Sequence, residues 1–208
     1  MAIQDRSFNP RRTLKYPALW DEMFFGDKIL VNGKVWPFLN VKKGKYRFRI
    51  LDGSNSRVYT LSLSNGAPFW VIGDEQGLLP KPLMRTSITI TPGERTDLVI
   101  DFQPYANNTQ ITLVNSAPAP YPGTPGVGVI PNVMRFVVVP GGGAFTSPLP
   151  ATLRAVNRIP ETDASRTRTL DLYKVPGQCG YQKWTINGLG FSDIQEYPQL
   201  GSTEIWSS

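Results

Sequence analysis

Short segments in which apolar and polar residues alternate occupy the chain from about residue 28 to residue 139. In one of them, Tyr46, Phe48 and Ile50 alternate with basic side chains. Because successive side chains of a β-strand point to opposite faces, each segment has one apolar and one polar face. The segments recur every roughly 8–12 residues, and none shows the period of an amphipathic helix. This pattern predicts an all-β fold, either an antiparallel sandwich or a barrel.

Turn-forming residues separate these segments, and the chain holds 19 glycines and 19 prolines among its 208 residues. Asn-Gly and Pro-Gly pairs favour the tight turns that join neighbouring strands. Two longer stretches are also rich in proline and glycine. Residues 115–132 are predicted to form a long loop, and residues 140–150 a linker between domains.

An internal echo links the two halves of the chain. The sequence ILVNGKVW at 29–36 is matched by WTINGLGF at 184–191, each an apolar strand that leads into Asn-Gly. The first copy continues into many further strands, whereas a single strand pair cannot bury a core alone. The C-terminal copy is therefore expected to be the opening of a second, incomplete β unit. Its apolar residues are expected to pack on residues 28–140 or to add a strand to another chain.

The composition excludes several kinds of chemistry. The chain contains no histidine and one cysteine, Cys179. Mechanisms that use Ser-His-Asp or Cys-His are excluded, as are zinc and copper sites with histidine ligands. Asp97 and Asp101 lie on one strand face, where a pair of acids could hydrolyse glycosides. Solvated strand positions explain both better, and no residue is assigned as catalytic, cofactor-binding or metal-binding.

The net charge of +6 raises the question of nucleic-acid binding. The densest basic group, in residues 42–49, alternates along a predicted strand and is interpreted as a solvated face, so no nucleic-acid partner is expected. No apolar run approaches the roughly 20 residues of a membrane helix, and no membrane partner is expected. The first residues have no apolar core typical of a signal peptide, and the sequence assigns no compartment.

Three long stretches, at residues 26–66, 71–82 and 91–102, carry a specific resemblance. Together they resemble the middle cupredoxin domain of three-domain multicopper oxidases, in the branch of spore-coat laccase, bilirubin oxidase and phenoxazinone synthase. The strand PNVMRFVV at 131–138 is similar to the last strand of that domain, and STEIWSS at 202–208 to a strand of the third domain. The resemblance covers nearly the whole chain.

The resemblance implies a Greek-key cupredoxin-like β-sandwich followed by an incomplete second β unit. On this basis residues 1–27 are expected to be a linker from a missing first domain, and residues 28–140 a copper-free middle domain. Residues 141–183 are expected to be an interdomain linker, and residues 184–208 the opening strands of an incomplete third domain.

The resemblance also implies a parent enzyme that oxidises phenols, bilirubin or metal ions and reduces O2 to water. Its copper ligands are histidines and one cysteine in the first and third domains. Cys179 lies in GQCGYQKW, which does not match the family's copper motif. This chain alone is therefore expected to bind no copper and to be a structural part without catalysis. Its expected partners are the missing first and third domains, another chain that completes the C-terminal unit, or a second copy in a homo-oligomer.

One alternative from another functional class remains open, because a fold does not determine a function. The chain could be a free-standing β-sandwich binding module that reuses the cupredoxin fold. Its binding site would then lie at the loop of residues 115–132 or at the end of the sandwich that carries Trp36.

Overall fold

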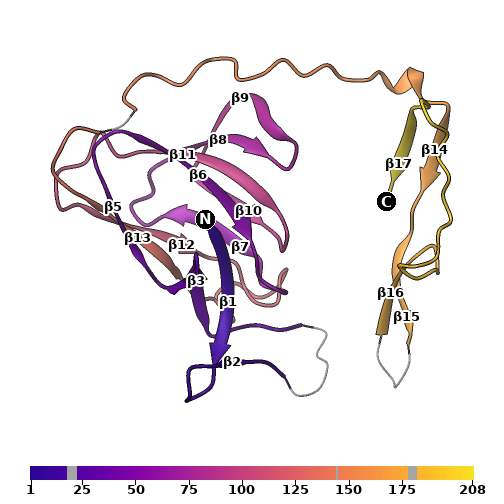
Figure 1. The fold of residues 1–208 in the computed structure, drawn as a ribbon, viewed down its shortest axis with the longest axis horizontal. Helices are drawn as coiled ribbons and strands as arrows, with labels where there is room; N and C mark the ends of the chain where they lie inside the picture. Colours follow the sequence, from indigo (N-terminus) through magenta and orange to yellow (C-terminus); the bar gives the residue numbers. More distant parts are fainter. Residues whose placement is uncertain (18–22, 144, 178–181) are drawn as a thin grey trace. The chain divides into compact units, whose positions relative to one another are not determined.

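The computed structural model of the chain describes residues 1–17, 23–143, 145–177 and 182–208. The chain divides into two compact units, unit 1 (Met1–Ala155) and unit 2 (Val156–Ser208). Seventeen strands and one short 3-10 helix, η1 (Glu161–Asp163), make up its regular structure in the described part (Figure 1). The prediction of an all-β fold is confirmed. The described residues form no helix long and apolar enough to cross a membrane.

Unit 1 contains two sheets. The larger has eight strands in the order β4-β3-β1-β6-β11-β8-β9, with β2 paired to β1 off that path. Its strands are β1 (Ala2–Phe8), β2 (Leu14–Lys15), β3 (Lys28–Val31), β4 (Lys34–Val35), β6 (Lys45–Asp52), β8 (Phe69–Asp74), β9 (Gly77–Arg85) and β11 (Arg95–Asp101). The smaller has the order β10-β7-β12-β13-β5. Its strands are β5 (Phe38–Val41), β7 (Tyr59–Leu63), β10 (Ser87–Ile90), β12 (Gln110–Asn115) and β13 (Asn132–Val138).

The chain of unit 1 crosses repeatedly from one sheet to the other, as in a Greek-key sandwich. Apolar side chains of both sheets meet in a single core. At its centre the ring of Phe136 lies 5.2 Å from that of Phe48 and 5.1 Å from that of Phe102, measured between ring centroids. The alternation seen in the sequence is reproduced in the burial of β7, where every second side chain is buried. Burial of apolar side chains between the two sheets provides the main driving force for the fold.

Both copies of the internal echo form the turn that their Asn-Gly pairs predict. Asn32 and Gly33 have φ angles of 49° and 80°, and Asn187 and Gly188 have 50° and 83°. These left-handed values are those of a type I′ hairpin turn, which asparagine and glycine tolerate best. The first turn joins β3 to β4. The long loop predicted at 115–132 is also present, since no strand lies between Asn115 and Asn132.

The N-terminal segment, expected to be a linker, contains a strand of the sandwich. Strand β1 pairs antiparallel with β3 and parallel with β6, in the middle of the larger sheet. Ile3 is fully buried in the core. The physical reason is that β1 buries alternate residues, Ile3 and Asp5, and only the first of these is apolar. An alternation that uses a buried charge cannot be recognised as a strand pattern from hydrophobicity alone.

Unit 2 consists of two separate strand pairs. β14 (Arg166–Thr169) pairs parallel with β17 (Glu204–Ser207), and β15 (Leu172–Pro176) pairs antiparallel with β16 (Gln182–Ile186). β14 and β15 lie within the stretch expected to be an interdomain linker. Their sequences, RTRT and LYKVP, lack the apolar alternation that marks a half-buried strand. Cys179 lies outside the described residues.

Candidate functional site

The two carboxylates considered as a paired-acid site are both held in ion pairs. Asp97 Oδ2 accepts a hydrogen bond from Arg47 Nε at 3.0 Å and lies 3.8 Å from Arg49 Nε. Asp101 Oδ2 lies 3.2 Å from Lys45 Nζ. These pairs join β11 to β6 across the sheet, so the basic alternation of β6 serves a ladder of cross-strand ion pairs. Both carboxylates are paired with basic side chains of the neighbouring strand, which favours the structural interpretation.

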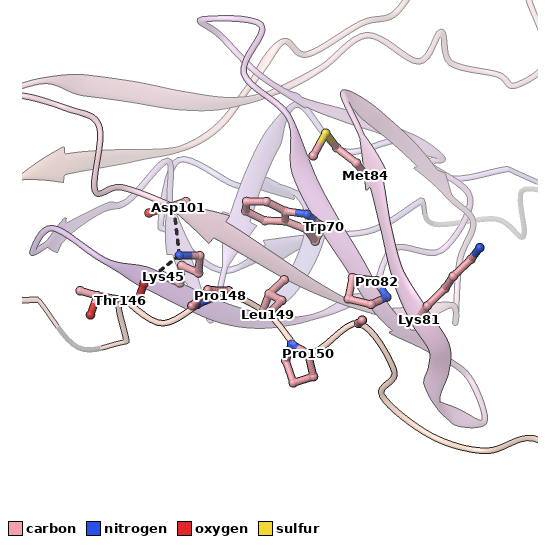
Figure 2. A pocket seen from close by; sticks show the side chains of 11 residues that line it. Lys45, Trp70, Lys81, Pro82, Met84, Asp101, Thr146, Pro148, Leu149 and Pro150 are labelled. Atoms are coloured by element: carbon pink, nitrogen blue, oxygen red, sulfur yellow. Dashed lines mark hydrogen bonds and ion pairs between the residues drawn. The ribbon is translucent and has the colours of Figure 1, made fainter.

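A groove of about 600 Å³ lies over these strands, where Trp70 and Met84 face a proline-rich segment (Figure 2). Lys45 Nζ donates to the Thr146 carbonyl at 3.2 Å as well as to Asp101, and the Leu153 N–H donates to the Pro80 carbonyl at 2.8 Å. The segment of residues 145–155, part of the predicted linker, is therefore fastened to unit 1. Lys45 is held between Asp101 and the Thr146 carbonyl, and a second lysine, Lys81, also lines the groove.

A second, more apolar groove of about 510 Å³ opens at the end of the sandwich that carries Trp36 and Phe38. Their exposed fractions are 47% and 69%, high values for aromatic side chains. The Lys28 ammonium lies 5.6 Å from the centroid of the Trp36 ring, a cation–π distance. Phe38 lies on β5, an edge strand of its sheet. This surface is one of the two candidate binding sites considered from the sequence, and exposed aromatic side chains line it.

Sequence reasoning missed a buried polar cluster beneath β1. The Arg57 guanidinium is 3% exposed, and its Nε donates to Asp5 Oδ2 at 2.9 Å. Its other nitrogens donate to the carbonyls of Gly26 at 3.1 Å and Gly128 at 2.9 Å. One buried arginine thus joins β1, the segment before β3 and the long loop. Asp5 and Arg57 are far apart in the sequence, so no local spacing could have revealed their pairing.

A second buried carboxylate belongs to the same region. Asp52 is fully buried at the end of β6, and its Oδ1 accepts the Ser54 N–H at 2.8 Å. Burial raises the pKa of Asp52 to about 6, against the opposing effect of the hydrogen bonds from Ser54. Burial also raises the pKa of Tyr59, whose hydroxyl lies 3.0 Å from Ser54 Oγ. Asp52 is therefore a buried carboxyl group whose pKa lies well above its ordinary value.

Ion pairs of one arginine join the two parallel strands of unit 2. Arg168 on β14 donates to Glu204 on β17 through Nε at 2.6 Å and through a terminal nitrogen at 3.0 Å, and it also pairs with Glu196. The hydrogen bond from Arg168 lowers the pKa of Glu204. Trp206 Nε1 donates to the same carboxylate at 3.0 Å. Beside these ion pairs lies an apolar groove of about 640 Å³, which is lined in part by Leu172, Trp184, Ile186, Phe191 and Trp206.

The part of the chain that the structure describes contains no set of side chains arranged to bind a metal ion. No group of three or more His, Cys, Asp or Glu side chains gathers there at distances that would hold a metal ion. The full sequence supplies no histidine at all. Arg95 forms an ion pair with Glu75.

Comparison with known proteins gives consistent relatives. The chain is 36% identical to the laccase of Bacillus subtilis, a match that covers 100% of the chain and 42% of that protein. It is 37% identical to Multicopper oxidase LPR1 of Arabidopsis thaliana, covering 99% of the chain and 37% of that protein. Among solved structures, the McoA multicopper oxidase of Aquifex aeolicus matches with 34% identity and a TM-score of 0.78, covering 94% of the chain and 42% of that protein.

The matches extend over both units of the chain. The chain spans between 33% and 44% of the length of the curated multicopper oxidases and laccases that it matches. A scan against protein-family models found no match. The relatives and the all-β sandwich agree with the resemblance seen in the sequence. Over its whole length the chain is similar in sequence and in fold to a part of multicopper oxidases.

Proposed function

We propose that this chain is a copper-free structural segment of a laccase-like multicopper oxidase. The observation that carries the proposal is the absence of histidine from all 208 residues of a chain that is similar to copper enzymes. The whole enzyme would oxidise phenols, bilirubin or metal ions and reduce O2 to water. The role of this chain would be to form a wall and spacer beside the copper-bearing parts.

The side chains present do not fit the family's copper sites. Copper in proteins is bound chiefly by imidazole nitrogen and by cysteine or methionine sulfur. The sequence offers one cysteine and no imidazole, and the carboxylates of unit 1 that were considered as a site are occupied by basic side chains. We therefore derive no catalytic step for this chain.

The proposal extends to the domain assignment. Unit 1 corresponds to a middle cupredoxin domain, with β1 incorporated into its larger sheet. Unit 2 corresponds to the opening strands of a further domain. Nearly all of its apolar side chains are exposed, Phe191 completely and Trp184 by 63%. Such a surface is unfavourable in water and is typical of an interface. We infer that further strands of the same enzyme, on the same chain or another, cover the groove of Trp184 and Phe191.

A copper-binding assay tests the proposal. The purified chain is incubated with Cu(II) and with Cu(I) under reducing conditions, passed over a chelating resin, and analysed for copper, blue absorbance and phenol oxidation. The laccase of Bacillus subtilis is the positive control, and Cys179→Ser controls for binding by the lone thiol. We expect far less than one copper per chain and no oxidation of phenols. One or more retained copper ions per chain, with oxidation of phenols, would refute the proposal.

The groove of Trp36 and Phe38 favours a second candidate function, a free-standing binding module. Two exposed aromatic side chains beside an edge strand form a surface that can bind a sugar ring or an extended peptide. A saturable ligand that binds the parent chain and is lost in Trp36→Ala, with unchanged thermal stability, would support this function. Thr146→Ala, in the other groove, is the control that should retain binding.

A further inference from the structure

Two fully buried carboxylates, Asp5 and Asp52, flank one small polar residue. Strand β1 runs parallel to β6, with Ile3 paired to Asp52. Ser54 Oγ accepts the backbone N–H of Asp5 at 3.2 Å, and the Ser54 N–H donates to Asp52 Oδ1 at 2.8 Å. Both aspartates are 0% exposed. The two carboxyl groups are therefore neighbours in the interior of the sandwich.

The hydrogen bonds to these carboxyl groups leave one oxygen of each unsatisfied. Asp5 Oδ2 accepts from Arg57 Nε at 2.9 Å and from the Gly26 N–H at 2.7 Å. Asp5 Oδ1 and Asp52 Oδ2, by contrast, are buried and have no hydrogen-bond partner in the described part of the chain. Buried polar atoms are nearly always paired, and an unpaired charged oxygen is especially unfavourable. Something other than the described residues must satisfy these two atoms.

The surrounding charges point to a missing positive charge. The titratable and charged groups around Asp52 are Asp5 on β1, Arg57 just before β7, Tyr59 at the first position of β7, Glu94 just before β11, and Arg95 at the first position of β11. Arg57 is engaged by Asp5, and Arg95 is engaged by Glu75. With both aspartates ionised, two buried negative charges would share a single buried cation. Such an imbalance inside a protein is normally removed by protonation.

We propose that Asp5 and Asp52 form a buried proton-binding site, in which one proton resides on Asp52 Oδ2 in mildly acidic solution and is released to water near neutral pH. The proton makes the Asp52 carboxyl neutral and turns its Oδ2 atom into a hydrogen-bond donor. One anion and one cation then remain in the cluster. Release of the proton restores a second buried negative charge beside β1 and weakens the attachment of that strand to β6.

A proton explains the site better than a metal ion. Calcium takes six to eight oxygen ligands, and magnesium requires near-ideal octahedral coordination. The Asp5 carboxyl is already paired with the Arg57 guanidinium, and the described residues contain no group of three or more His, Cys, Asp or Glu side chains that could hold a metal ion. The pKa of Asp52, raised to about 6 chiefly by burial and further by the charges of Asp5 and Glu94, agrees with protonation.

The pH range of the site can be observed without interference from histidine. Because the chain contains none, no imidazole changes its charge between pH 5 and 7. The α-amino group of Met1, whose pKa is lowered by burial, is followed as a separate titration. A carboxyl whose pKa is higher in the folded than in the unfolded chain stabilises the fold at low pH and loses that stabilisation as pH rises. From the pKa of about 6, the folding equilibrium constant of unit 1 should fall about tenfold between pH 5 and pH 7.

Nuclear magnetic resonance of the full chain tests the proposal directly. The 13C shift of the Asp52 carboxyl carbon is followed from pH 3 to pH 8, and amide hydrogen exchange of β1 is measured at pH 5 and pH 7 after correction for the intrinsic rate. We expect a titration midpoint between pH 5 and 7 and a loss of protection in β1 at the higher pH. A midpoint below pH 4.5 would overturn the proposal.

A variant supplies the second test. Asp52→Asn keeps the shape and the acceptor for Ser54 and imitates the protonated acid, so the tenfold change in folding between pH 5 and 7 should disappear. Asp74→Asn, at an exposed turn, is the matched control and should keep the parent's profile. Retention of the parent's profile by Asp52→Asn would contradict the proposal. So would stabilisation of the parent, but not of Asp52→Asn, by millimolar CaCl2 or NaCl at pH 7, since this would identify a cation site.

Discussion

The two units contain similar strand–turn segments, but only unit 1 packs its strands into two layers around a buried core. Both contain an apolar strand that ends in an Asn-Gly turn with left-handed φ angles. Unit 1 continues into two sheets that bury a common core, whereas in unit 2 the only described residues classed as buried are Arg168 and Thr185. Strand and turn chemistry therefore specify hairpins in both units. Only the packing of a second layer converts hairpins into a stable domain.

The largest expected difference concerns large apolar side chains. Phe136→Ala in the core of unit 1 should lower the free energy of unfolding by about 4 kcal/mol, because it leaves a cavity between Phe48 and Phe102. Trp184→Ala in unit 2 should change it by less than about 0.5 kcal/mol, because this side chain is largely exposed. Urea denaturation monitored by circular dichroism measures both. Equal losses in the two variants would show that unit 2 has a core of its own.

Removing the arginine of the main ion pair in each unit should affect the stability of that unit alone. Arg57→Met leaves Asp5 buried without its cation, and we expect a loss of roughly 3 kcal/mol in the stability of unit 1. Arg168→Met should abolish the hydrogen-exchange protection of β14 and β17 without lowering the denaturation midpoint of unit 1. A loss of the unit 1 midpoint in Arg168→Met would show that the two units fold as one.

The pH responses of the two units should have opposite signs. The pKa of Asp52 is raised, so unit 1 should lose about 1 kcal/mol of stability as pH rises from 5 to 7. The pKa of Glu204 is lowered by Arg168, so its contribution to unit 2 is present above the ordinary glutamate pKa and is lost as pH falls further. Amide exchange of β1 and β17, measured from pH 3 to pH 7, separates the two effects. Parallel responses of both strands would contradict this assignment.

A small loss is also expected when the ion-pair ladder on the solvent face of unit 1 is broken. Asp97→Asn removes the partner of Arg47 and Arg49 on the solvent face of β6 and β11. Exposed pairs contribute little, so the stability should fall by no more than about 1 kcal/mol. Thermal denaturation at low and high salt measures the change, and the difference between variant and parent should shrink as salt is added. A loss as large as that of Phe136→Ala would show that the ladder is a principal support of unit 1.

Alternation and turn signals were sufficient to predict strands where the buried positions are apolar. They identified β6, β7 and β12, whose buried side chains alternate regularly. They missed β1 as part of the sandwich because it buries Asp5, and β14 because its sequence is RTRT. Strands that use charge in place of apolar surface have no hydrophobic period to detect.

The absence of histidine could be read from composition, whereas the buried acid cluster could not. A histidine count is a property of the whole sequence, independent of folding. The Asp5–Asp52 site arises only when β1 is laid beside β6 and Arg57 is enclosed by the long loop. Its members carry no shared spacing, and each aspartate alone would be expected at the surface.

Hydrogen exchange over the whole chain, read by mass spectrometry at pH 5, tests the contrast between the units most directly. The account predicts strong protection in β6, β11 and β12, which surround the core, and weak protection in β15 and β16, which have exposed apolar faces and no second layer among the described residues. Protection of β15 and β16 equal to that of β6 in the isolated chain would contradict it, because unit 2 would then be a closed domain.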